Sequence, residues 1–362
     1  MDLPVMPPLA PMLAKSAKQV PHADGHLYEP KWDGFRAIVF RDGDEIEIAS
    51  RSTKSLTRYF PDVVESIRQN APGRCVLDGE IVIASDGRLS FDLLSNRIHP
   101  AESRVTMLAR ETPASFVAFD LLALDDRSLL DEPLSVRREA LVQALSGAQP
   151  PVHVTRVTED PEEAERWFTT FEGAGLDGVI AKRLDGAYVP NGRSMLKVKH
   201  ARTADVVLAG YRLHKNSTAE RPLLGSMLLG IHADDGRLQH VGVAASFTEA
   251  RRAELIDELA PLELAEGESH PWDLWRDEQA QASGRLPGGQ SRWTGTKDLS
   301  FVPLRPERVL EVAYEHMEGE GDQARFRHMG RFQRWRPDRE PESCTYDQLE
   351  EVARYDLGDV LI

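Results

Sequence analysis

A lysine near the N-terminus of this 362-residue chain has neighbours that suit a nucleophile. Residues 28–36 read YEPKWDGFR, so Lys31 has an acid two positions before it, an Asp-Gly pair two positions after it and an arginine five positions after it. A free lysine has a pKa of about 10.4. Since an amine attacks only when neutral, nearby cations or a metal must favour that form. We interpret Lys31 as a nucleophile at the lip of a pocket.

The pattern Lys-x-Asp-Gly-x-Arg resembles the active-site motif of the covalent nucleotidyltransferases, the superfamily of DNA ligases, RNA ligases and mRNA capping enzymes. The resemblance implies that Lys31 takes a nucleoside monophosphate onto its side-chain nitrogen. Attack on an α-phosphate gathers negative charge on the phosphate oxygens, so fixed Lys and Arg donors and Mg²⁺ are expected around it.

Further motifs follow in the order that the resemblance predicts. Arg51 follows Ser50 in an element that binds ribose and the 5′-phosphate of a nick. The apolar run 76–83 contains Glu80, a carboxylate for ribose or metal, and the run 116–122 contains Phe119, which packs on the base. Residues 176–182 match the fourth motif. Lys197 and Lys199 share one face of a strand, because strand side chains repeat every two residues, and so reach the same phosphates.

The resemblance assigns a role to each of these residues. Glu29 reads the adenine edge, and Asp33 orients Lys31 or the ribose. The expected catalytic residues are Lys31, Asp33, Arg36, Lys197, Lys199, Arg336 and Arg339. The expected nucleotide-binding residues are Glu29, Lys31, Arg36, Arg51, Glu80, Phe119, Lys182, Lys197 and Lys199. The expected metal ligands are Glu80 and Asp177, and the expected DNA contacts are Arg51, Lys182, Arg183, Arg193 and Arg202.

Each element alone has a simpler interpretation. Asp-Gly is a common turn dipeptide. Phe119 alone would be a core residue, Arg51 a surface residue, and Lys197 with Lys199 a solvated strand face. The functional interpretation depends on the motifs occurring together, in order, in matching strand and turn contexts.

Two positions depart from the family pattern. Relatives usually carry Glu-Gly in the fourth motif, whereas Asp177 precedes glycine here, so we expect it to contact a metal through water. The sixth motif resembles Arg-x-Asp-Lys but ends in Arg339. Arginine is a planar fork and not a point charge, so this change affects how pyrophosphate is held.

The net charge of −15 argues against a nucleic-acid partner, but its distribution does not. Residues 178–215 contain eight Lys or Arg against two acids, and residues 323–340 contain six Arg against two acids. Residues 249–278 contain ten acids against three Arg. A basic surface on an acidic chain suits a protein that follows a phosphate backbone.

The length suggests two domains, with a boundary near residues 200–203. Residues 1–201 alternate strand-like runs (37–40, 76–84, 116–122, 179–181, 194–198) with amphipathic stretches (62–70, 136–144, 161–172). We predict a mixed α/β nucleotidyltransferase domain there, ATP-grasp-like. Residues 202–362 contain short strands (205–212, 226–231, 238–243, 309–314, 324–335) and a helix at 248–259. We predict an OB-fold β-barrel with a C-terminal extension, and hence an α+β protein.

Other features limit the class of protein. No apolar run approaches a membrane span, and no signal peptide is seen. Two cysteines leave no four-cysteine zinc site and no disulfide framework, which is consistent with a reducing cytoplasm. The family resemblance implies that this cytoplasm is bacterial, with association with the nucleoid during function. The lack of zinc cysteines, with only thirty residues before Lys31, argues against NAD-dependent ligases. The segment 267–295 has no clear period and is expected to be a loop or extension.

Within the superfamily, the chain is most similar to compact stand-alone bacterial ATP-dependent DNA ligases of the ligase C type. This implies an enzyme that seals 5′-phosphate/3′-hydroxyl nicks in DNA repair through lysyl-AMP. The expected cofactors are ATP and Mg²⁺, with Mn²⁺ as a substitute. We expect a monomer that acts on nicked duplex DNA, has no membrane partner and has other DNA-repair proteins as candidate partners. The alternatives are an RNA ligase, an mRNA-capping-type nucleotidyltransferase and a non-enzymatic DNA-binding module.

Overall fold

A computed structural model describes residues 1–200, 202–265, 267–274, 286–287, 300–319, 321–349 and 355–361. The chain divides into two compact units, Met1–His200 together with Val352–Ile362, and Ala201–Glu351. Most of the predicted segment 267–295 lies outside the described residues. We describe each unit by itself.

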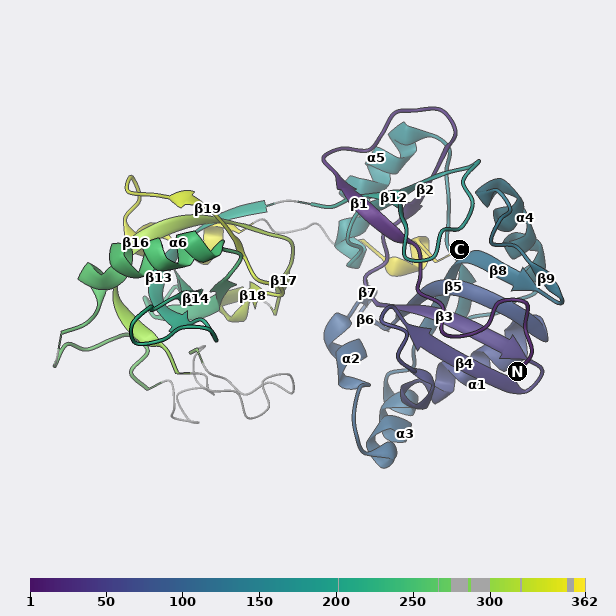
Figure 1. Cartoon of the computed structure of the whole chain (residues 1–362), viewed down its shortest axis with the longest axis horizontal. Coiled ribbons are helices and arrows are strands. Elements are labelled where there is room, and N and C mark those ends of the chain that lie inside the picture. The colour runs from purple at the N-terminus through teal and green to yellow at the C-terminus, as the bar shows by residue number, and fades with distance from the viewer. Residues whose placement is uncertain are drawn as a thin grey trace. The chain divides into compact units, whose positions relative to one another are not determined.

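The first unit contains a six-stranded sheet of order β10-β8-β5-β3-β4, with β9 paired to β8 (Figure 1). Its strands are β3 (Phe35–Asp42), β4 (Glu45–Ser50), β5 (Arg74–Val82), β8 (Ser115–Leu124), β9 (Arg127–Ser128) and β10 (Val152–Val154). All neighbours are antiparallel except β10, which runs parallel to β8. The central strands β5 and β8 are almost wholly buried, as their continuous apolar sequences predict.

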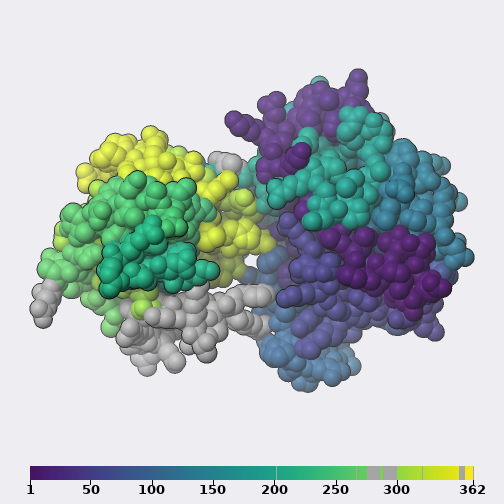
Figure 2. All heavy atoms as spheres, viewed as in Figure 1, coloured from purple at the N-terminus to yellow at the C-terminus, as the bar shows by residue number. Residues whose placement is uncertain are grey.

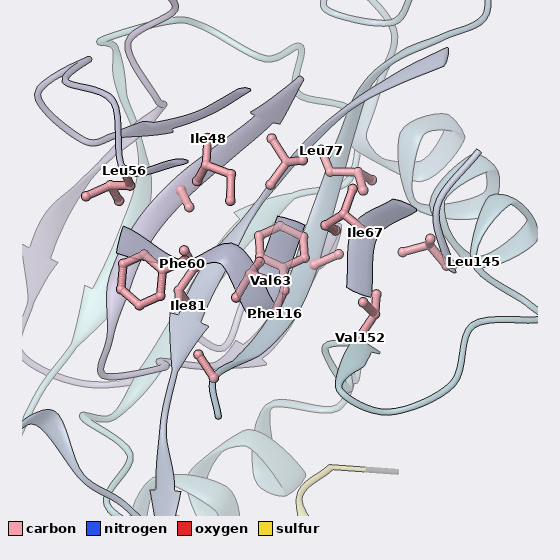
Figure 3. Packing of buried hydrophobic residues seen from close by; sticks show 14 of the residues in the cluster. Ile48, Leu56, Phe60, Val63, Ile67, Leu77, Ile81, Phe116, Leu145 and Val152 are labelled. Atoms are coloured by element: carbon pink, nitrogen blue, oxygen red, sulfur yellow. The ribbon is translucent and has the colours of Figure 1, made fainter. Parts of the chain in front are cut away.

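One face of this sheet is closed by a hydrophobic core beneath α1 (Pro61–Asn70) (Figure 3). Val63 and Ile67, four residues apart on one face of α1, pack with Leu77, Ile81 and Phe116 of the sheet. Pro61 begins the helix, where its missing N–H costs no hydrogen bond. This packing fixes β5 and β3, the strands that carry Glu80 and Arg36.

A second sheet of order β1-β12-β11-β2 carries the Lys31 segment. Its strands are β1 (Leu13–Ala17), β2 (His26–Pro30), β11 (Val179–Arg183) and β12 (Arg193–Val198). β1 is parallel to β12, although almost the whole unit separates them in sequence. In Figure 2, N-terminal atoms (purple) accordingly share a face with teal atoms from the 150–200 region.

The remaining elements of the first unit are helices and a small hairpin. The helices are α2 (Phe91–Asn96), α3 (Glu102–Glu111), α4 (Leu134–Ala144) and α5 (Pro161–Thr170), and the hairpin is β6 (Ala84–Ser85) with β7 (Arg88–Leu89). Asp160 caps α5 by accepting a hydrogen bond from the Glu162 N–H, as expected for an N-cap aspartate.

The C-terminal segment differs from the expectation that residues 202–362 form one unit. Leu357 and Val360 are at most 2% exposed and pack with Trp167 and Phe171 of the first unit. The Leu357 N–H also donates to the carbonyl of Gly87, at 2.8 Å. Burial of these apolar side chains explains why the segment belongs to the first unit.

The second unit is built on a five-stranded antiparallel sheet of order β15-β14-β13-β16-β19. Its strands are β13 (Arg202–Leu213), β14 (Leu224–His232), β15 (Leu238–Ala244), β16 (Val302–Tyr314) and β19 (Arg331–Trp335), with the pair β17 (Met317–Glu318) and β18 (Arg325–Phe326). An isolated bridge between Ala244 and Gly330 links the outer strands, so the described residues do not form a fully paired barrel. The predicted strand over 324–335 is in fact two strands, β18 and β19.

The helix predicted over 248–259 is α6 (Glu249–Leu259), capped by the side chain of Thr248. Leu255, Ile256 and Leu259 of α6 are buried in the core of the second unit. Within the described ranges, every helix is too short or too polar to cross a membrane.

Candidate active site

A cavity of about 220 Å³ in the first unit gathers half of the predicted site residues. Its walls include residues of β1, β2, β11 and β12 from one sheet and of β3, β5 and β8 from the other. The lining residues are Pro11, Met12, Leu13, Ala14, Glu29, Pro30, Lys31, Trp32, Arg36, Arg51, Glu80, Phe119, Ile180, Met195, Lys197 and Lys199.

Lys31 is held at the wall of this cavity by Asp177. The Lys31 amine donates a hydrogen bond to the Asp177 carboxylate, and the Lys199 Nζ lies 2.9 Å from the same oxygen. Their backbones also pair: the Lys31 N–H donates to the Gly178 carbonyl at 2.8 Å, and the Asp177 N–H donates to the Lys31 carbonyl at 2.9 Å. The carboxylate is 4% exposed, whereas Lys31 is 20% exposed and faces the cavity.

The glycines of two Asp-Gly pairs, Gly34 and Gly178, allow close packing of the backbone and do not only form turns. A Cβ at Gly34 would lie 2.2 Å from the Ile81 carbonyl oxygen, and one at Gly178 would lie 2.0 Å from the Val198 carbonyl oxygen. Gly178 also has φ of +123°, which L side chains rarely adopt. Glycine therefore lets the Lys31 segment approach both sheets.

Arg36 is fixed by a buried carboxylate. Its Nε and Nη2 each donate to Asp78 at 2.6 Å, and the Tyr188 hydroxyl donates to the same carboxylate at 2.6 Å. Asp78 is fully buried. Burial opposes the charge on Arg36, but Asp78 more than offsets it and raises the pKa of the guanidinium. A bidentate pair of this kind sets the orientation of Arg36 as well as its charge.

Glu80 lines the cavity opposite Arg36 in the β3–β5 pairing. Burial raises the pKa of Glu80 to about 7, although the positive charges of Arg36 and Lys31 oppose the shift. The carboxylate therefore has less compensating charge than its burial requires, and an added cation would stabilise its ionised form.

Glu29 and Lys182 form a buried ion pair beside the aromatic ring of Phe119. The Lys182 Nζ lies 2.7 Å from Glu29 Oε1 and 4.7 Å from the centre of the Phe119 ring. The Arg36 guanidinium lies 4.3 Å from the same ring centre. Glu29 and Phe119 line the cavity, while Lys182 stands behind Glu29.

The predicted DNA contacts do not form one uniform set. Arg51, Arg183 and Arg193 are exposed, whereas Lys182 is 4% exposed and paired with Glu29. Burial of Lys182 corrects its assignment to a DNA surface, since it has no free face for a phosphate. Arg183 is itself paired with Asp185 at 2.7 Å. Arg202 begins β13 in the second unit, so the structure does not place it with the others.

Arg336 and Arg339 also lie in the second unit, and the structure does not place them relative to the cavity. Arg336 Nη1 donates to both oxygens of Asp205 at 2.9 Å, and its Nε and Nη2 donate to Asp338. Arg339 Nε is 3.5 Å from Asp205. Asp33 is half-buried and lies outside the cavity lining.

Three supporting residues were absent from the sequence prediction. Asp78 lies two positions before Glu80, so the period of a strand could have placed both on one face. Asp205 is one of two acids in the basic run 178–215, and it pairs with the arginines of the sixth motif. Tyr188, which contacts Asp78 across 110 positions, has no sequence signal.

Comparison with known proteins agrees with this geometry. Residues 11–199 match the family described as "ATP dependent DNA ligase domain", and residues 220–339 match "ATP dependent DNA ligase C terminal region". "DNA ligase C" of Mycobacterium tuberculosis (strain ATCC 25618 / H37Rv) is 53% identical over 365 residues, covering 100% of this chain and 99% of that protein.

Two further relatives extend the comparison. "DNA ligase C2" of Mycolicibacterium smegmatis (strain ATCC 700084 / mc(2)155) is 55% identical over 97% of this chain and 96% of its own length. One solved structure is described as "DNA binding with a minimal scaffold: Structure-function analysis of Lig E DNA ligases". Its match spans 89% of this chain and 99% of that chain, with a TM-score of 0.50 and 17% identity. At this identity the match supports the fold alone. The predicted α+β class, a nucleotidyltransferase domain followed by an OB-fold domain, is confirmed. The chain belongs to the ATP-dependent DNA ligases.

Proposed function

We propose that this ligase seals nicks in duplex DNA that carry a 5′-phosphate and a 3′-hydroxyl, with Lys31 as the residue that accepts AMP. The observation that carries the proposal is the cavity in which Lys31, Arg36, Lys197 and Lys199 converge on one space. Four cations around a small cavity suit a triphosphate and the charge that develops during its cleavage.

In the first step, Lys31 Nζ attacks the α-phosphorus of ATP. A nitrogen–phosphorus bond forms, the bond between the α-phosphorus and its bridging oxygen breaks, and pyrophosphate leaves. Asp177, which accepts a hydrogen bond from Lys31, is placed to take the proton that the amine must lose. Lys197 and Lys199 neutralise the α-phosphate oxygens, and Arg336 and Arg339 act on the leaving pyrophosphate.

The residues present fit Mg²⁺. Mg²⁺ is usually held by one or two carboxylates together with substrate phosphates. Glu80 and Asp177 supply two carboxylates, and the positive charges of Arg36 and Lys31 only partly offset the burial of Glu80. Among the described residues, no cluster of three or more His, Cys, Asp or Glu could hold a metal by itself. When bound, the metal would supply Lewis-acid stabilisation of the phosphate. Mn²⁺ is expected to substitute.

In the later steps, Lys31 passes AMP to the 5′-phosphate of the nick, and the 3′-hydroxyl displaces AMP. Arg51 is exposed at the cavity wall, which suits a contact with that 5′-phosphate. Arg183, Arg193 and Arg202 are the proposed contacts with the DNA backbone. We propose that the protein acts as a monomer in the cytoplasm, with other DNA-repair proteins as candidate partners.

The test is sealing of a labelled nicked duplex with ATP and Mg²⁺, with DNA or RNA on each side of the nick. The expected result is closure of the all-DNA nick, none with Lys31→Ala, and normal closure with Lys18→Ala, which removes an exposed lysine. Closure of RNA nicks alone would assign an RNA ligase instead. In a separate assay without DNA, formation of a covalent enzyme–nucleotide adduct with GTP but not with ATP would assign a capping-type enzyme.

A further inference from the structure

The Glu29–Lys182 pair is unusual because the two residues face the cavity differently. Both are 4–5% exposed, yet only Glu29 is part of the cavity wall. In the antiparallel pairing of β2 with β11, Glu29 stands opposite Ile180, so Lys182 reaches it diagonally, two residues further along β11. A nucleotide in the cavity would therefore meet the carboxylate and not the ammonium group behind it.

The charge of Glu29 depends on the cations around it. Burial raises the pKa of Glu29, and Lys182, Arg138 and Arg36 oppose that shift in decreasing order. Arg36 is committed to Asp78. Arg138, on α4, donates from Nη2 to the Thr155 carbonyl at 2.6 Å; burial lowers the pKa of its guanidinium, and Glu29 opposes that shift. Lys182, whose Nζ lies 2.7 Å from Glu29 Oε1, is therefore the group that most favours the ionised form of Glu29.

The protonation state of Glu29 decides what it can bind. An ionised carboxylate only accepts hydrogen bonds, whereas a protonated one also donates. The 6-amino group of adenine donates, and the 6-oxo group of guanine only accepts. A pure acceptor at this wall thus favours a 6-amino purine, while a protonated Glu29 would accommodate either base.

We propose that Lys182 is a positioning residue for nucleotide selection, which holds Glu29 as a fixed acceptor for the 6-amino group of ATP and so excludes GTP. The proposal rests on the proposed binding of ATP in this cavity and deepens it. Arg138 also favours the ionised form of Glu29, with a smaller effect than Lys182. Lys182 touches the nucleotide only through Glu29.

The test is the ratio of adduct formation with ATP to that with GTP, measured as the second-order rate of enzyme–nucleotide formation with each. Lys182→Met is expected to lower this ratio about tenfold, which is the order of magnitude that one mismatched hydrogen bond at a buried site costs. Lys182→Arg, which keeps the charge, should restore most of the ratio. Lys18→Met, an exposed control, should leave it unchanged.

The outcomes separate this inference from the proposed function. No adduct with ATP in the unaltered protein would overturn the proposed function itself. Equal loss of both nucleotides in Lys182→Met, with an unchanged ratio, would show a purely structural role and overturn the inference. If Lys182→Met does not fold, Arg138→Leu and Glu29→Gln replace it, and an unchanged ratio in both overturns the inference equally.

Discussion

The two units hold their arginines in different surroundings. In the first unit, Arg36 is paired with Asp78, a carboxylate with no exposed surface. In the second unit, Arg336 is paired with Asp205, which is 13% exposed, and with Asp338, which is 61% exposed. A buried charge depends on its partner, because loss of the partner leaves an uncompensated charge in a low dielectric. An exposed charge keeps water as an alternative partner.

This difference indicates that the arginines of the two units have different functions. The cavity cations are positioned in advance by ion pairs with buried carboxylates, Arg36 by Asp78 and Lys31 and Lys199 by Asp177. The Arg336 side chain is about as exposed as that of Arg36, at 18% against 19%, but its partner Asp338 is 61% exposed, so Arg336 can exchange that acid for phosphate. Substitutions in the first unit should therefore affect stability and chemistry together, and those in the second unit should affect one reaction step with little effect on stability.

The largest effect is expected for Asp78→Ala. Removing this carboxylate leaves Arg36 without its partner, which should lower the free energy of unfolding by about 3–5 kcal/mol. Adduct formation at Lys31 should fall at least about a hundredfold, because Arg36 loses its orientation. Urea unfolding and adduct assays check both. Asp185→Ala, which breaks the exposed pair with Arg183, is the matched control and should change little. Similar stability losses in the two variants would contradict the comparison.

The next effect concerns Arg336→Ala. Because Arg336 acts on pyrophosphate in our proposal, adduct formation should fall about a hundredfold while sealing of a pre-adenylated nick stays near normal. The melting temperature should also stay near that of the unaltered protein. Arg334→Ala, two positions earlier and within β19, is the control. Equal losses in both reaction steps would mean that Arg336 serves the nick as well.

A smaller effect is expected from Glu80→Gln in metal-free buffer. The pKa of Glu80 is raised to about 7, above its ordinary value, so the folded protein favours the protonated form of Glu80. The stability that this preference gives is fully present below about pH 4.5 and is lost as the pH rises through 7. Glutamine stays neutral. The variant should gain about 1–2 kcal/mol relative to the unaltered protein between pH 5 and 8, discounted for the partial exposure of Glu80.

Denaturation at several pH values measures this gain. Glu139→Gln, at an exposed position on α4, is the control and should show no such trend. A difference between Glu80→Gln and the unaltered protein that is constant with pH would show that Glu80 is not held near neutrality by burial.

The smallest effect concerns DNA binding. Each phosphate contact contributes about −0.9 to the slope of log affinity against log salt. Arg193→Ala should reduce the slope by about one contact, and Arg183→Ala by less, because Asp185 already neutralises part of its charge. Lys182→Met should leave the slope unchanged, because this lysine is buried. Titrations of nicked and intact duplex at several salt concentrations check this, and nicked duplex should bind more tightly. A reduced slope in Lys182→Met would show that Lys182 contacts a DNA phosphate after all.

Much of this fold could be predicted because its elements carry local signals. The alternation of β12 and the continuous apolar runs of β5 and β8 predicted these strands, and the helices predicted over 62–70 and 161–172 have apolar faces. The helix predicted over 136–144 also forms, although α4 buries Arg137 and exposes Val136 and Val142. The order of the motifs predicted a site around Lys31, and the cavity brings Arg36, Glu80 and Lys197 to it.

The remainder depends on contacts between distant segments. The pairing of β1 with β12 brings Met12 into the cavity wall, and no local pattern reports such a pairing. Lys182 was assigned to DNA because strand alternation does not say which face is buried. The C-terminal segment was assigned to the second unit because two apolar residues, Leu357 and Val360, are too few to give a period.

The mass of the intact protein tests the central claim most directly. After incubation with ATP and Mg²⁺, the protein should gain the mass of one AMP, the adduct should survive acid, and peptide mapping should locate it at Lys31. Lys31→Ala should show no gain, while Lys18→Ala should gain normally. An adduct that persists in Lys31→Ala, or one located at Lys197 or Lys199, would contradict the assignment of Lys31 as the nucleophile.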